Sequence, residues 1–83
     1  MRMYFFYILY SDTLSKYYYG SSSCMEERLK KHNTHHKGFT GKANDWRLVY
    51  SEGYSEKLLA LKREQEVKNW KSRKRVEELI RRI

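Results

Sequence analysis

The chain has no proline, a single cysteine and no long hydrophobic run. Because Cys24 stands alone, a disulfide within the chain and a cysteine-based zinc site are both excluded, and we expect a reducing, cytoplasmic setting. The apolar run at residues 3–10 is too short for a membrane helix, and no small-residue cleavage pattern follows it. We therefore expect neither a membrane span nor a signal peptide.

The length of 83 residues predicts one domain, residues 1–83, with a small core. Eight tyrosines, three phenylalanines and two tryptophans strengthen that core, because aromatic side chains bury large areas. No internal repeat or low-complexity tract divides the chain.

Positive charge is concentrated in the second half of the chain. The formal net charge is +8, of which +6 falls in residues 57–83. Such a surface suits a polyanion through phosphate neutralisation and counterion release, although a structural domain with a basic, solubilising surface is the alternative. The pattern favours nucleic acid, DNA or RNA, as the partner. The cations that we expect to contact it are Lys37, Lys42, Lys68, Lys71, Arg73, Lys74 and Arg75.

Alternating apolar residues predict a small sheet between helices. In residues 4–10 both alternating sets are apolar or aromatic, which is typical of a central strand covered on both sides. Trp46, Leu48 and Tyr50 should share one face of a later strand. Candidate helix N-caps are Ser21, Ser22, Ser23, Ser55 and Ser72. We expect an α/β fold of the α+β kind, with a three-stranded antiparallel-type sheet in the order β-β-α-β-α-α, from strands at 4–10, 16–20 and 46–52 and helices at 25–33, 56–70 and 72–83.

Arg28 and His32 depart from the solvated side of the first predicted helix. With Met25 and Leu29 they fall within an arc of about 100°. An arginine aimed at a tyrosine-rich sheet can pack its stem and keep its head in water. Snorkelling explains Arg28 alone, but it explains the grouping of Arg28 and His32 with tyrosines less well.

Glu64 interrupts an apolar stripe on the second predicted helix. It shares one face with Ala60, Leu61 and Val67, where a carboxylate is costly unless it is paired, hydrated or bound to a metal. An i,i+4 ion pair with Lys68 is the structural alternative. Glu64 is therefore a candidate functional residue.

Gly20 ends the second predicted strand. It permits a close approach or a positive φ, unless it only terminates the strand. The stretch 34–45 is typical of a loop. His35 and His36 lie near His32 there, but no cysteine or closely spaced carboxylate completes a zinc site.

The ordered set of these residues resembles the GIY-YIG nuclease domain family. The resemblance rests on Tyr7-Ile8-Leu9, Tyr18-Tyr19-Gly20, Arg28 eight residues later, His32-Asn33, Trp46-Arg47-Leu48-Val49-Tyr50 and Ala60-Leu61-Lys62-Arg63-Glu64. It covers essentially the whole chain. The tail Trp70-Lys71-Ser72-Arg73 is similar to that of small stand-alone bacterial members. The same domain type occurs at the N-terminus of an excinuclease protein and in homing endonucleases.

The resemblance implies an endonuclease that hydrolyses DNA phosphodiester bonds, as in DNA repair. The resemblance also implies that Glu64 holds one Mg²⁺ or Mn²⁺ and that Arg28 stabilises the charge that develops on the phosphate. Tyr7 resembles the general base, with a pKa that Arg28 and the metal could lower. Tyr18 would orient water or phosphate or replace Tyr7, and His32 would relay a proton. Taken singly, each tyrosine is explained as well by core packing.

The chain departs from the family pattern at three positions outside these candidate catalytic residues. Some repair members carry a lysine directly after the glycine, where this chain has Ser21. The family usually has a proline where Asp45 precedes Trp46. Asn69 lies too close to Glu64 to take the role of the distal asparagine of larger members. A binding module with little turnover is thus the alternative function, and a homodimer or protein partner could supply specificity.

Overall fold

The strand β1 (Tyr4–Ser11) lies in the middle of a three-stranded sheet, between β2 (Lys16–Ser22) and β3 (Arg47–Tyr54). Both pairings are antiparallel. The structure is a computed structural model that describes residues 3–33 and 42–82. The predicted three-stranded antiparallel sheet is confirmed.

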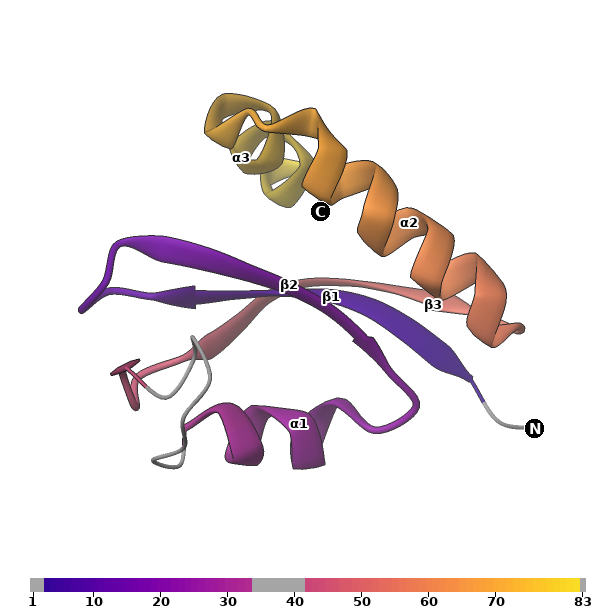
Figure 1. The fold of residues 1–83 in the computed structure, drawn as a ribbon, viewed down its shortest axis with the longest axis horizontal. Helices are drawn as coiled ribbons and strands as arrows, with labels where there is room; N and C mark the ends of the chain where they lie inside the picture. Colours follow the sequence, from indigo (N-terminus) through magenta and orange to yellow (C-terminus); the bar gives the residue numbers. More distant parts are fainter. Residues whose placement is uncertain (1–2, 34–41, 83) are drawn as a thin grey trace.

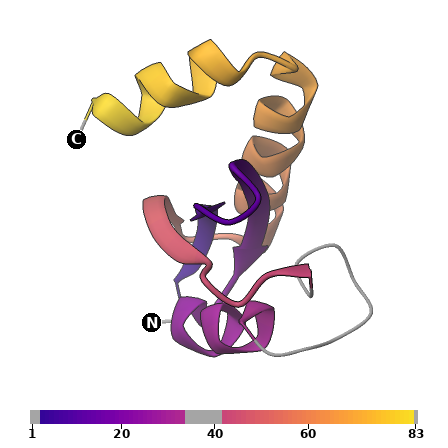
Figure 2. The same cartoon turned by 90° about the vertical axis from the view of Figure 1, so that its left-hand side faces the viewer.

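Helices cover both faces of this sheet (Figure 1). The helix α1 (Met25–His32) lies on one face, and α2 (Lys57–Trp70) and α3 (Arg73–Arg81) lie on the other. Figure 2 shows the sheet edge-on between them, with α3 turning away from the axis of α2. The predicted order β-β-α-β-α-α is confirmed. In the described part of the chain, every helix is too short or too polar to cross a bilayer.

The alternation of β1 builds a core on each face. Phe6 and Ile8 are fully buried against Val67 and Val76 of the helices α2 and α3. Tyr7, Leu9 and Trp46 form the second core, on the α1 side, together with partly buried residues of α1. The prediction of a central strand covered on both sides is confirmed.

A bulge at Val49 overturns part of the predicted pattern of β3. Ile8 pairs with Tyr50, but Leu9 pairs with Leu48, so β3 contains one extra residue between them. The ring of Tyr50 consequently lies on the α2 side, 6.4 Å from the Phe6 ring centroid, whereas Leu48 faces the α1 side. The prediction that Trp46, Leu48 and Tyr50 share one face is wrong, because strict alternation ignores the extra residue.

The N-caps predicted for two of the three helices are also wrong. Ser21 and Ser22 belong to β2, where they pair with Phe6 and Phe5, and Cys24 is the N-cap of α1. Glu56, not Ser55, is the N-cap of α2, and neither cap residue accepts a side-chain bond from the helix. The third prediction is confirmed, since the Ser72 hydroxyl accepts a hydrogen bond from the amide of Arg75.

Glu52 ties the bulged strand to α2. Its carboxylate accepts hydrogen bonds from the hydroxyls of Tyr50 and Tyr54 and from two nitrogens of Arg63, at 3.0 and 3.2 Å. Burial raises the pKa of Glu52, but these hydrogen bonds outweigh burial and hold the pKa below its usual range. Burial and the bond to Glu52 raise the pKa of each tyrosine to about 12.

Candidate active site

Tyr7 lies against Gly20 of the neighbouring strand. The two residues are paired across β1 and β2, and a Cβ atom on Gly20 would sit 2.5 Å from the Tyr7 hydroxyl oxygen. None of the glycines in the described residues has a positive φ. Of the interpretations predicted for Gly20, close approach is the one that the structure supports, because any side chain there would displace the phenol.

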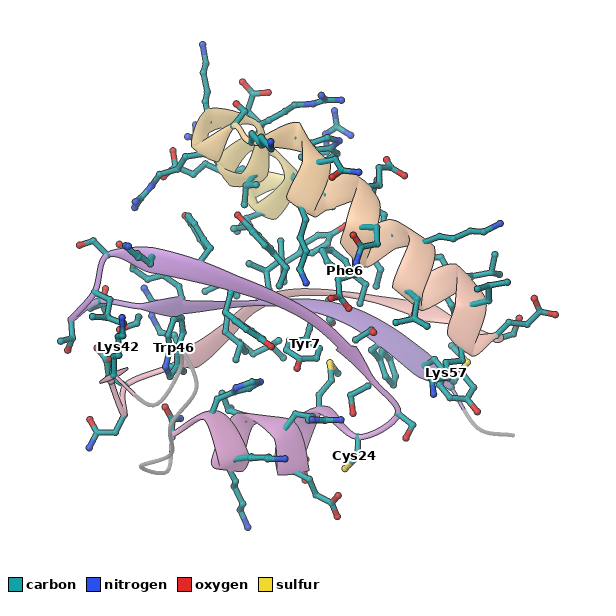
Figure 3. The ribbon with its side chains drawn as sticks, viewed as in Figure 1. Phe6, Tyr7, Cys24, Lys42, Trp46 and Lys57 are labelled. Atoms are coloured by element: carbon teal, nitrogen blue, oxygen red, sulfur yellow. The ribbon has the colours of Figure 1, made fainter. Side chains whose placement is uncertain are left out.

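The Tyr7 hydroxyl meets the imidazole of His32 at the end of α1. The oxygen lies 3.2 Å from Nε2, and both side chains are almost fully buried. The ring of Tyr18 packs on the same imidazole, with centroids 4.6 Å apart. The structure thus brings together three of the predicted site residues in one contact group, and Figure 3 shows Tyr7 between the sheet and α1.

Two hydrogen bonds from the Asn33 side chain to the backbone of Trp46, which the sequence did not predict, fix the end of α1. The Asn33 side chain donates to the carbonyl of Trp46 at 2.9 Å and accepts from its amide at 2.7 Å. Asn33 follows His32 directly, so these two hydrogen bonds hold the imidazole at the second core. Asp45, at the position where the family usually has proline, accepts hydrogen bonds from Ser11 and Thr13. It thereby joins the start of β3 to the β1–β2 turn.

Tyr7 is a neutral phenol in this environment. Burial, together with Tyr18 and Glu64, raises its pKa to about 12, and Arg28 opposes the shift without reversing it. The sequence suggested that Arg28 and a metal together could lower the pKa of Tyr7; Arg28 acts in that direction but does not by itself outweigh burial. Burial of the phenol is the stronger effect. Tyr7 consequently needs an acceptor for its own proton before it can act as a base.

Arg28 is exposed, although its position on α1 predicted a face packed on the sheet. Its guanidinium has no hydrogen bond or ion pair with any described residue. It borders a pocket of about 260 Å³ between the β2–α1 turn and α2. Arg28 influences the pKa of Tyr7, so the guanidinium and the phenol lie close enough to interact electrostatically.

Glu64 approaches the end of β2 from the face of the sheet opposite to α1. Its carboxylate accepts a hydrogen bond from the Ser21 hydroxyl at 2.9 Å and lies 2.6 Å from the Lys68 ammonium. The ion pair considered from the sequence is thus present, together with a contact to β2 that spacing along the helix could not reveal. Leu61 is 39% exposed, so the apolar stripe around Glu64 is narrower than predicted.

The two halves of the site meet at residues 20–21 of β2, an edge strand. Tyr7 packs on Gly20 on the α1 side, and Glu64 bonds to Ser21 on the α2 side. Glu64 also contributes to the raised pKa of Tyr7. Ser21 is the residue that sequence reasoning missed. Its one signal was strand alternation, which places it on the face opposite to the ring of Tyr7.

Of the predicted nucleic-acid contacts, Lys68 pairs with Glu64 at the edge of the site, and the others in the described residues lie farther along the chain or elsewhere. Lys68, Lys71, Lys74, Arg73 and Arg75 gather where α2 passes into α3. Arg73 donates to the Ser15 carbonyl at 2.7 Å, and the Arg75 guanidinium lies 4.4 Å from the Trp70 ring centroid. Figure 3 places Lys42 beside Trp46, toward the end of the sheet away from Lys57. Lys37, His35 and His36 fall outside the described residues.

The described residues contain no group of three or more histidine, cysteine, aspartate or glutamate side chains that could hold a metal ion. A cation at Glu64 would therefore have fewer than three such ligands from this part of the chain. That donor set fits Mg²⁺, which keeps most of its waters and takes substrate oxygens. It does not fit a structural zinc ion, which needs four protein ligands.

Comparisons with known proteins agree with this geometry. No curated protein matches the chain significantly. Among solved structures, the chain is similar to a UPF0213 protein from Bacillus halodurans, determined in solution by NMR, with 28% sequence identity and a TM-score of 0.58. The match covers 94% of this chain and 82% of the other. The model of the GIY-YIG catalytic domain matches residues 3–77, and the chain therefore belongs to this family of nuclease domains.

Proposed function

We propose that the protein is an endonuclease that hydrolyses DNA phosphodiester bonds with the help of one divalent cation, with RNA as the alternative substrate. The observation that carries this proposal is the meeting of four chemical groups at residues 20–21. A phenol paired with an imidazole, a guanidinium without a counterion and a partly buried carboxylate all approach this segment. One chain supplies all of them, so the proposal holds for a monomer or a homodimer.

Tyr7 and His32 would activate the attacking water as a pair. The Tyr7 oxygen takes a proton from water while its own proton passes to Nε2 of His32, 3.2 Å away. The hydroxide formed attacks phosphorus, and the leaving oxygen takes its proton from solvent. This relay explains how a phenol with a pKa of about 12 can serve near neutral pH. It requires an unprotonated Nε2, and Tyr18 holds the imidazole ring from its other side.

Arg28 and Glu64 would manage charge at the phosphate. The exposed guanidinium can donate two parallel hydrogen bonds to phosphate oxygens as negative charge builds on them. Glu64 would hold the Mg²⁺ or Mn²⁺, which supplies Lewis-acid stabilisation of that charge when bound. Ser21 orients the carboxylate by donating to it.

Cleavage assays with matched variants test the proposal. Purified protein is incubated with Mg²⁺ or Mn²⁺ and with duplex, nicked, flapped and single-stranded DNA. We expect cleavage of at least one of these, reduced about 100-fold or more by Glu64→Gln and by Arg28→Ala. Glu66→Gln is the control, since Glu66 lies on the same helix but pairs with Arg63. Failure to cleave every substrate in both metals, by a protein with normal circular dichroism, contradicts the proposal.

A nucleic-acid-binding module with little turnover is the second candidate. Both oxygens of Glu64 already have partners, Ser21 and Lys68, and the pKa of Tyr7 is raised. These features favour a resting site of low activity. The second candidate predicts salt-dependent binding to DNA that Glu64→Gln leaves unchanged, with no cleavage.

A further inference from the structure

A pocket of about 260 Å³ separates the β2–α1 turn from the start of α2. Figure 3 shows Lys57 at the start of α2 and Cys24 on the other side of the sheet, just before α1. The sequence did not indicate this pocket. One of its cations, Lys57, is not among the predicted nucleic-acid contacts. The lining residues are Tyr4, Ser21, Ser22, Ser23, Arg28, Lys57 and Ala60.

Two cations meet in this pocket without a counterion. Arg28 comes from α1 and Lys57 from α2, on opposite faces of the sheet, and both are exposed. Neither side chain has an ion pair or hydrogen bond with a described residue, and no carboxylate of the described residues lines the pocket. Converging positive charges repel each other, so an anion between them would be stabilised by both.

The wall of the pocket also offers a hydroxyl donor for an oxyanion. Ser21, Ser22 and Ser23 follow one another along the end of β2 and its turn. The Ser21 hydroxyl donates to Glu64 and the Ser22 hydroxyl to the Cys24 carbonyl, whereas the Ser23 hydroxyl has no such bond within the described residues and can donate to a ligand. The Ser22 hydroxyl lies 3.0 Å from the amide nitrogen of Cys24 and 3.2 Å from its carbonyl oxygen, which holds the turn in shape. A phosphate group accepts several hydrogen bonds at once and carries the negative charge that the two cations lack.

The pocket is continuous with the candidate active site through Ser21, which lines it and also donates to Glu64 at 2.9 Å. We infer that the pocket binds a phosphate group of the nucleic-acid strand and that Lys57 is its second cation, beside Arg28. The inference rests on the proposed function and adds a substrate-binding residue to it. Lys57 would hold the strand so that a phosphodiester lies near Glu64.

Binding measurements with Lys57→Met test the assignment, and Lys62→Met is the matched control. Lys62 is an exposed lysine on the same helix and does not line this pocket. The probe is a fluorescent strand of ten thymidines at about 50 mM salt. We expect Lys57→Met to weaken binding about fivefold or more and to lower the salt slope by about 1. Lys62→Met should change the affinity less than twofold.

Three forms of phosphate distinguish the source of the bound group. The strand is tested with a 5′-hydroxyl and with a 5′-phosphate, and inorganic phosphate is titrated while the amide signals of Ser21 to Ser23 are followed by NMR. A preference for the 5′-phosphate that Lys57→Met removes assigns the pocket to a strand end. Equal affinities that Lys57→Met weakens equally assign it to an internal phosphodiester. Inorganic phosphate should shift the serine signals in the wild type and not in Lys57→Met.

The subsite and the hydrolytic function can fail separately. Equal effects of Lys57→Met and Lys62→Met on strand binding overturn the subsite, even if cleavage depends on Glu64. If the protein cleaves no DNA, but Lys57→Met weakens strand binding and Lys62→Met does not, the result supports the subsite and contradicts the hydrolytic function.

Discussion

The Lys68 ammonium lies 2.6 Å from an oxygen of Glu64, the carboxylate whose other oxygen accepts a hydrogen bond from Ser21. The Glu64 side chain is 13% exposed and that of Lys68 is 41% exposed, so the pair is formed at the rim of the site. In the proposed function, a divalent cation at Glu64 would compete with this ammonium for the same oxygen. Lys68 would then stabilise the carboxylate in the absence of metal and weaken the binding of metal.

Removing the ammonium should therefore tighten metal binding. We expect Lys68→Met to lower the dissociation constant for Mn²⁺ about twofold to fivefold, as suits an ion pair worth up to about 1 kcal/mol. Isothermal titration calorimetry at low salt measures the change, and Lys62→Met again serves as the control. An unchanged or weaker affinity in Lys68→Met would show that the cation does not compete with Lys68.

The pair of Tyr7 and His32 predicts a particular pH dependence of cleavage. Tyr7 stays protonated up to a pKa of about 12, so it does not titrate in the assay range. In the proposed relay the acceptor of its proton is the His32 imidazole, so the reaction does not need the phenol to ionise. Cleavage should therefore show no rise that follows ionisation of an ordinary phenol, whose pKa is near ~10. A rate that keeps rising toward pH ~10 would contradict the relay.

Variants of the same pair should separate the two tyrosines. We expect Tyr7→Phe and His32→Gln to lower kcat by about 100-fold or more, since each breaks the proton relay. Tyr18→Phe keeps the ring that packs on His32 and should lose less than tenfold. Single-turnover cleavage rates decide between them. A larger loss in Tyr18→Phe than in Tyr7→Phe would assign the base to Tyr18.

The contact between Gly20 and Tyr7 predicts a large effect for one methyl group. Gly20→Ala places a Cβ atom 2.5 Å from the buried phenol oxygen, so Tyr7 or the strand must move. We expect a loss of about 1–3 kcal/mol in the free energy of unfolding and a loss of cleavage. In Gly53→Ala the nearest atom is the flexible end of Met3 at 2.9 Å, so this control should cost less. Urea unfolding compares the two, and equal costs would contradict the prediction.

The sequence predicted those parts of the fold that depend on local pattern. Both alternating sets of residues 4–10 are apolar, and β1 is indeed the central strand with a core on each side. Ser72 lies before a run with a clear helical stripe, and it caps α3. The sequence predicted the order of strands and helices because their periods of two and 3.6 residues are legible in a single chain.

What the sequence could not predict depends on contacts between distant segments. The bulge at Val49 arises from the register between β1 and β3, and strict alternation misplaced Tyr50 as a result. Ser21 and Glu64 are 43 residues apart, and their hydrogen bond exists because α2 crosses the end of β2. The pKa of Tyr7 depends on the burial of its ring, which no spacing of residues along the chain could predict.

The carboxylate of Glu52 makes the stability of the fold depend on acid. Its pKa is held below the usual range, so its hydrogen bonds to Arg63 and the two tyrosines stabilise the fold fully above the unfolded value of about 4.3. That stability is lost as pH falls through the lowered pKa. We expect Glu52→Gln to lower the free energy of unfolding by about 1–3 kcal/mol at pH 7 and to flatten its decline below pH ~4. Urea unfolding at pH 7, 4 and 3 measures both effects. Glu66→Gln removes only an exposed partner of Arg63, and an equally flattened decline in that variant would show that the acid dependence arises elsewhere.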